Sequence, residues 1–177
     1  NITVNITPHN QDLKGFEAFL EFSAHFRNKN IPVPHIYAVN NETDCYLQED
    51  LGNTTLFDFL TTTRETEGFS IKIVDEYKKV LRELPRIQLV AGKDIDFGYC
   101  YPREAFDKQS MMWDLNYFKY YFLKLAKVSF DEQALEDDFQ TFSDYLLAVD
   151  NNAFLYRDFQ SRNIMLKDRK STRLNSS

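Results

Sequence analysis

The chain has 177 residues, of which 43% are hydrophobic and 27% charged, a composition typical of a soluble globular protein. That length suits one ordinary domain, or one and a half lobes of a larger two-lobed enzyme. The formal net charge of -6 argues against nucleic acid as a partner, because an acidic surface repels phosphate backbones. No apolar run approaches the roughly 18–20 residues that span a bilayer, and no signal-peptide pattern opens the chain. We therefore expect a cytoplasmic protein without a membrane partner.

The N-terminal part of the chain predicts strand, helix, strand and strand, in that order. Residues 2–7 alternate apolar and polar side chains, which is typical of a half-buried strand. Asp12 is a candidate N-cap for the helix that follows. Residues 35–39 and 44–49 predict two further strands, joined by a turn at 40–43.

The rest of the chain has helical periodicity. Thr54 or Thr55 is expected to cap a short helix, and Pro85 is expected to kink or restart a longer one whose apolar stripe covers 71–84. Two later apolar stripes, rich in aromatic residues, repeat at helical spacing, and we predict that both belong to the core. The first comprises Trp113, Tyr117, Tyr120, Tyr121 and Leu125, and the second comprises Leu135, Phe139, Phe142, Leu146 and Leu147.

These patterns predict an α+β fold with three segments. Residues 1–52 form a β-α-β-β segment, and residues 53–167 form a mostly helical region. Residues 168–177 lose all apolar patterning, so we expect that tail to be disordered or foreign to the fold.

Residues 156–163 are the strongest candidate for chemistry, with the sequence YRDFQSRN between two apolar runs that can pin a short loop. Asp158 can accept a proton from an attacking hydroxyl, and the amide oxygen of Asn163 suits Mg²⁺ that bridges phosphates. Arg157 and Arg162 place positive charge beside the carboxylate, which favours its ionised form and can meet phosphate oxygens. On spacing alone, the alternative interpretation is a surface loop with an Asp–Arg ion pair.

The same loop resembles known catalytic loops. It resembles the H-R-D-x-x-x-x-N loop of protein kinases and, more closely, the R-D-F-[HQ]-S-R-N-[IL]-M form of bacterial aminoglycoside phosphotransferase-like proteins, including amino-sugar anomeric kinases. Tyr156 stands where the kinase loop has His, which is a departure from the kinase form. The resemblance implies a catalytic role for Asp158 and a Mg²⁺-binding role for Asn163.

A second stretch, residues 46–53, has the sequence YLQEDLGN and looks like the L-x-E-D-L-G hinge of the same family. In that family the adenine of ATP pairs with backbone groups between two lobes, so the resemblance implies contacts at Glu49 and Leu51. Taken alone, the stretch also fits a strand followed by a glycine turn and a helix cap. Glu17 matches the kinase helix Glu that pairs with a strand Lys, although a solvated helix-face carboxylate fits it equally well and residues 2–7 contain no Lys.

The resemblance implies a protein-kinase-like two-lobed fold, of which residues 1–52 are a partial N-lobe ending in the hinge and 53–167 a C-lobe truncated after the catalytic loop. No glycine-rich phosphate loop precedes Ile2, and Asp168 comes too early to be the second metal-binding Asp of the D-F-G type. We therefore expect a fragment that lacks both parts and has no useful kinase activity by itself.

The resemblance implies that the intact protein is an ATP- and Mg²⁺-dependent phosphotransferase, which acts on a hydroxyl of a small molecule. The family suggests a sugar or amino sugar as the acceptor, and an acidic helical lobe suits a cationic aminoglycoside or choline equally well. One alternative is a non-catalytic nucleotide-binding or scaffold module with a kinase-like shape. Another is a structural helical protein in which the motif matches are accidental.

Overall fold

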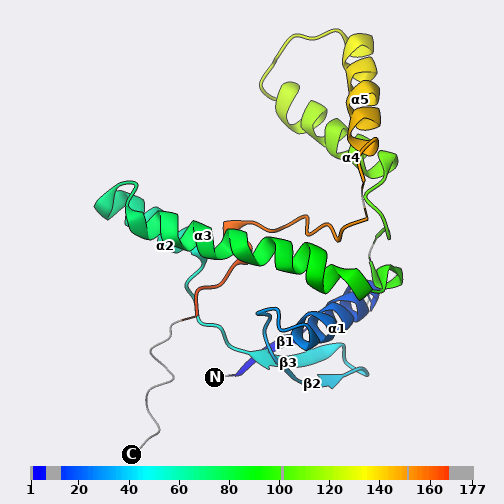
Figure 1. Cartoon of the computed structure of the whole chain (residues 1–177). Coiled ribbons are helices and arrows are strands. Elements are labelled where there is room, and N and C mark those ends of the chain that lie inside the picture. Colours follow the sequence, from blue (N-terminus) through cyan, green and yellow to red (C-terminus); the bar gives the residue numbers. More distant parts are fainter. Residues whose placement is uncertain (1, 7–12, 101, 151, 168–177) are drawn as a thin grey trace, which may run out of the picture. The chain divides into compact units, whose positions relative to one another are not determined.

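The computed structural model describes residues 2–6, 13–100, 102–150 and 152–167 (Figure 1). The fold is α+β, as predicted, and the chain forms two compact units. The first unit runs to Tyr99 and resumes at Phe154, and the second is Cys100–Ala153. None of the helices in the described ranges has both the length and the apolar character that crossing a membrane requires.

The first unit begins with a small antiparallel sheet. Strand β1 (Ile2–Ile6) is followed by helix α1 (Leu13–Asn28) and then by strands β2 (Ile36–Asn40) and β3 (Cys45–Glu49), so the predicted order of elements is confirmed. The sheet order is β1-β3-β2, and both pairings are antiparallel. The strand that ends at Glu49 is therefore held on both of its edges. The predicted N-cap Asp12 lies outside the described residues.

Helix α1 covers the sheet with aromatic side chains and ends in a defined turn. The rings of Phe16 and Phe19 lie 6.1 and 4.8 Å from the ring of Tyr46 in β3. At the C-terminal end, Asn30 takes a left-handed backbone conformation with φ 57, which lets Ile31 N–H donate to the carbonyl of Phe26 at 2.9 Å. This is the pattern of a Schellman motif, and the side chains of residues 26 and 31 are both buried in one core cluster.

Helix α2 (Leu56–Glu67) starts at the predicted cap Thr55. The Thr55 side chain accepts a hydrogen bond from Asp58 N–H at 3.0 Å, and the Asp58 carboxylate accepts one from Thr55 N–H at 3.2 Å. Helix α3 (Ile71–Pro85) has Ser70 as its N-cap without a side-chain capping bond. The break predicted at Pro85 takes the form of a change from α-helix to a π-helical turn, as expected for a residue without an N–H group.

The two caps give a testable contrast in stability. We expect Thr55→Ala to lower the free energy of unfolding by about 1 kcal/mol, because the Asp58 N–H in the first turn loses its acceptor, the Thr55 hydroxyl. Ser70→Ala is the matched control and should be neutral or slightly stabilising, since the buried Ser70 hydroxyl has no hydrogen-bond partner among the described residues. Urea unfolding of both variants measures the difference, and equal losses would contradict the capping assignment.

Two core clusters hold the first unit together. One contains Phe26, Ile31, Ile87, Ala91 and Ile95. The other contains Leu56, Leu60 and Ile73, with Ile164 and Leu166 packed against it. The boundary predicted between residues 52 and 53 falls inside this unit, because the first cluster joins side chains from both sides of it.

The second unit is built on helix α4 (Lys108–Phe118), a π-helical turn over Lys119–Leu123 and helix α5 (Glu132–Leu147). The prediction that both aromatic-rich stripes belong to the core is wrong for most of their residues. Trp113, Tyr117, Tyr120, Tyr121 and Leu125 are all exposed, as are Phe142 and Leu146. Among the described residues of this unit, those buried are Ser110, Lys119, Phe139 and Ser143. Helical periodicity identifies an apolar face but does not say which face meets the neighbouring helix.

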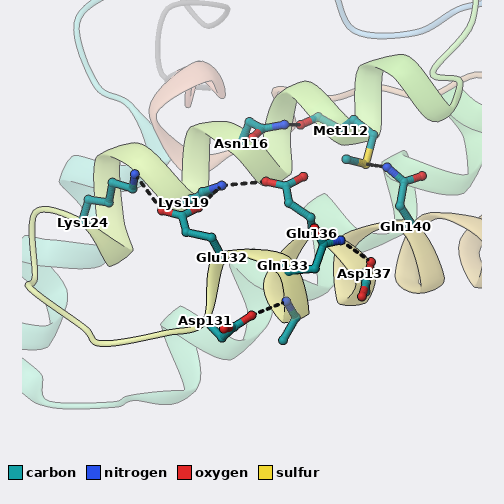
Figure 2. A network of polar contacts seen from close by, with 11 residues as sticks. Met112, Asn116, Lys119, Lys124, Asp131, Glu132, Gln133, Glu136, Asp137 and Gln140 are labelled. Carbon is teal, nitrogen blue, oxygen red and sulfur yellow. Dashed lines mark hydrogen bonds and ion pairs between the residues drawn. The ribbon is translucent and has the colours of Figure 1, made fainter.

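An ion-pair network ties the π-helical turn to the start of α5 (Figure 2). The buried Lys119 ammonium lies 2.6 Å from a carboxylate oxygen of Glu132 and 2.6 Å from one of Glu136, and Lys124 lies 3.0 Å from Glu132. The hydrogen bond to Glu132 is the main cause that raises the pKa of Lys119 above its ordinary value, and the bond to Glu136 adds to it. Lys119 therefore stays charged although its side chain is buried.

Candidate active-site loop

The chain re-enters the first unit at Phe154 and runs back beside α2 and α3 (Figure 1). The ring of Phe154 packs on Phe26 with a centroid distance of 5.4 Å, and its N–H donates to the carbonyl of Gln88 at 3.3 Å. Phe159 packs against the same core cluster. Two aromatic side chains thus anchor the first half of the loop over 156–163.

Gly92 allows this close approach. A Cβ atom added to Gly92 would overlap the Cβ of Phe154 and come within 3.3 Å of the carbonyl oxygen of Ile87. Any residue larger than glycine must therefore push the loop's entry away from the core. No local pattern in the sequence indicates this contact, because the two residues are far apart in the chain.

Tyr156 packs between the two anchors. Its ring makes edge contacts with Phe154 and Phe159, at centroid distances of 6.3 and 5.5 Å. Burial raises the pKa of the Tyr156 hydroxyl above its usual range, and the negative charge of Asp158 adds to that effect. The tyrosine is therefore neutral and supports the loop by packing.

Asp158 and Asn163 are joined through the backbone of the loop. The carbonyl oxygen of Asp158 accepts hydrogen bonds from Gln160 N–H at 2.8 Å and from the Asn163 side-chain amide at 3.0 Å. Ser161–Asn163 form a single 3-10 turn that gives the loop its bend. Because the amide nitrogen of Asn163 is used in this bond, its amide oxygen is the end left for another ligand. Asp158 is exposed.

The exit of the loop lies against the start of α2. Ile164 accepts a hydrogen bond from Leu56 N–H at 2.8 Å, and Leu166 N–H donates to the carbonyl of Thr54 at 2.9 Å. Met165 and Thr55 form an isolated antiparallel bridge, so the two segments pair at one point and not as strands. The reason is that the chain turns into helix at residue 56 and offers no longer partner.

The predicted hinge follows β3, and we call residues 49–56 the adenine connector. Glu49 N–H donates to the carbonyl of His35 at 2.7 Å, so this N–H already has an acceptor, in the residue that precedes β2. Leu51 N–H has no acceptor among the described residues, and Gly52 turns the chain with φ 82. The Glu49 carboxylate accepts a bond from His35 N–H at 3.3 Å and pairs with Lys167, and the bond from Lys167 is the main cause that lowers the pKa of Glu49.

The remaining predicted residues lie in different places. Arg162 stacks its guanidinium over the ring of Phe57 at 4.4 Å, a cation–π contact that holds its positive charge on the α2 side of the loop. Arg157 is exposed on the loop. Glu17 is exposed on α1, and within the described residues it has no ion-pair partner. No local pattern in the sequence marks Phe57 or Lys167 as a neighbour of these residues.

The arrangement offers one clear Mg²⁺ ligand, the amide oxygen of Asn163. In the described ranges no three His, Cys, Asp or Glu residues gather closely enough to hold a metal ion by themselves. Phosphate oxygens and water would have to complete the shell, as is usual for Mg²⁺. Comparisons of the chain with protein-family models, curated proteins and solved structures find no match.

Proposed function

We propose that the chain carries the adenine connector and the catalytic loop of an ATP-dependent phosphotransferase with a protein-kinase-like two-lobed fold. Its acceptor is a hydroxyl of a small molecule, with sugars and amino sugars first. The observation that supports this most directly is the bond from the Asn163 amide to the Asp158 carbonyl. With that bond in place, the exposed carboxylate of Asp158 and the amide oxygen of Asn163 lie on one short loop. The loop is anchored in a core cluster on each side.

The chemistry assigned to these residues is phosphoryl transfer. The acceptor oxygen forms a bond to the γ-phosphorus of ATP, the bond to ADP breaks, and the hydroxyl proton passes to the Asp158 carboxylate. Mg²⁺, when bound, neutralises charge on the phosphate oxygens. Asn163 provides one oxygen ligand for that ion, and Arg162 adds positive charge at the same loop.

The connector supports the same proposal from the adenine side. Leu51 N–H, without an acceptor among the described residues, is a donor that a purine ring nitrogen can take. The hydrogen bonds that join residues 54 and 56 to residues 166 and 164 link this connector to the catalytic loop. A nucleotide with adenine at one end and phosphates at the other therefore has both kinds of partner on linked segments.

Binding experiments with this chain test the role of Asn163. We expect Asn163→Ala to weaken MgATP binding by about tenfold or more, because one oxygen ligand of the ion is lost. Adenosine binding should not change, since adenosine has no phosphate and binds at the connector only. Isothermal titration calorimetry with each ligand measures the two affinities separately. The control is Asn28→Ala, which replaces an exposed asparagine at the end of α1.

Two outcomes would contradict the proposal. If the native chain binds neither adenosine nor MgATP, the nucleotide site itself is wrong. If it binds both and Asn163→Ala leaves the MgATP affinity unchanged, the metal-binding role of Asn163 is wrong while the connector stands.

A further inference from the structure

One ion pair joins residues that are 118 positions apart in the chain. The Lys167 ammonium pairs with one carboxylate oxygen of Glu49, and the other oxygen of Glu49 accepts the N–H of His35 at 3.3 Å. Glu49 is the last residue of β3, so its backbone is held by the sheet while its side chain reaches the segment that leaves the catalytic loop.

The pair ends a row of links between two segments. Starting from the loop, the exit segment is bonded to the connector at Ile164–Leu56, then at Leu166–Thr54, and finally at Lys167–Glu49. The first two links are backbone hydrogen bonds and start at the helix end of the connector. The third is the one that reaches the sheet end, where the predicted adenine contacts lie.

This position separates the pair from most other ion pairs of the first unit. Those at Asp75–Lys78, Glu76–Lys79 and Glu83–Arg86 join residues three positions apart, the first two within α3 and the third across its C-terminal end, so their effect is local. The pair at Glu49 sets instead the spacing between the end of the sheet and the chain that follows Asn163.

We infer that Lys167 is a positioning residue, which through Glu49 holds the adenine connector and the Mg²⁺-binding end of the catalytic loop at the spacing that one bound nucleotide needs. This inference rests on the proposed function. The physical reason is that a ligand bound at two points loses affinity when the distance between those points varies, because binding then has to remove that freedom. A ligand held at the connector alone does not depend on that spacing.

The test compares a two-point ligand with a one-point ligand. In Lys167→Met we expect the dissociation constant of MgATP to rise about three- to fivefold, the range that follows from the energy of an exposed ion pair. The dissociation constant of adenosine should change by less than about 1.5-fold, since the backbone pairing of β3, from which the connector starts, does not involve the Lys167 side chain. Lys167→Arg keeps the charge and should restore most of the MgATP affinity.

Lys72→Met is the matched control. Lys72 pairs with Glu67 at 2.5 Å, and its side chain is 61% exposed, against 59% for Lys167. Its pair lies away from both the connector and the loop, so this variant should leave both affinities unchanged. Amide hydrogen exchange at Leu166 gives a second measurement that needs no nucleotide, and we expect faster exchange in Lys167→Met only.

Each result decides the matter. Unchanged MgATP affinity together with unchanged exchange at Leu166 overturns the inference and leaves the proposed function standing. Equal losses for adenosine and MgATP also overturn it, because they indicate a general loss of structure. Failure of the native chain to bind either ligand overturns the proposed function, and the inference with it.

Discussion

Asp158→Asn should lower kcat for ATP-dependent phosphorylation by about 10²- to 10⁴-fold while leaving MgATP binding nearly unchanged, because the amide cannot accept the hydroxyl proton. Asparagine has the same size as aspartate, and the interactions that hold residue 158 in the loop come from its backbone carbonyl. The loop should therefore keep its shape. The loss is measured by steady-state kinetics on the full-length gene product. The acceptors are a panel of sugars, amino sugars and aminoglycosides.

A matched variant separates this effect from a simple change of charge. Asp75→Asn removes a carboxylate from an exposed position on α3, where Asp75 lies 3.9 Å from Lys78, and should leave kcat unchanged. A normal kcat in Asp158→Asn would exclude the role of this residue as a base. If the native protein turns over ATP with none of the acceptors, the proposed reaction is wrong as a whole.

Gly92→Ala should lower the free energy of unfolding by about 1–3 kcal/mol, the usual result of overpacking a tight core contact. Gly92 is buried, and the added methyl group would overlap the Cβ of Phe154 while meeting the Ile87 carbonyl at 3.3 Å. Since both neighbours belong to the backbone or lie next to it, neither can move as freely as the end of a long side chain. Urea unfolding measures the loss.

Two variants define the cause of that loss. Gly98→Ala should change stability little, because Gly98 is exposed and its added methyl group would meet the movable Asp96 carboxylate at 3.0 Å. Adding Phe154→Ala to Gly92→Ala should not relieve the overlap, since alanine keeps the Cβ atom that the new methyl group meets. Full rescue by that double variant would show that ring crowding, and not close approach of the backbone, is the reason for the glycine.

Local sequence predicted the elements of this fold well where local chemistry decides them. Thr55 caps α2 as expected, because a capping box depends on residues only three positions apart. The order strand, helix, strand, strand was predicted from alternation and periodicity for the same reason. The end of α3 at Pro85 follows from the missing N–H of proline.

Faces and long-range partners were predicted less well. Trp113 and Tyr117 lie on a stripe that looked like core, yet both are exposed, and the buried residue on the π-helical turn is Lys119. A lysine can take that place because Glu132 and Glu136 meet its ammonium from α5, an arrangement that no periodicity reveals.

For the candidate site, the sequence by itself determined the residues of the loop and the chemistry they suit, because Asp158 and Asn163 lie five positions apart on one short segment. Only the tertiary structure decided how that segment is held. Its entry depends on Gly92, its exit on Thr54 and Leu56, and its link to the sheet on Glu49. These contacts join residues far apart in the chain, so they form only when the chain folds back on itself, and no local pattern encodes them.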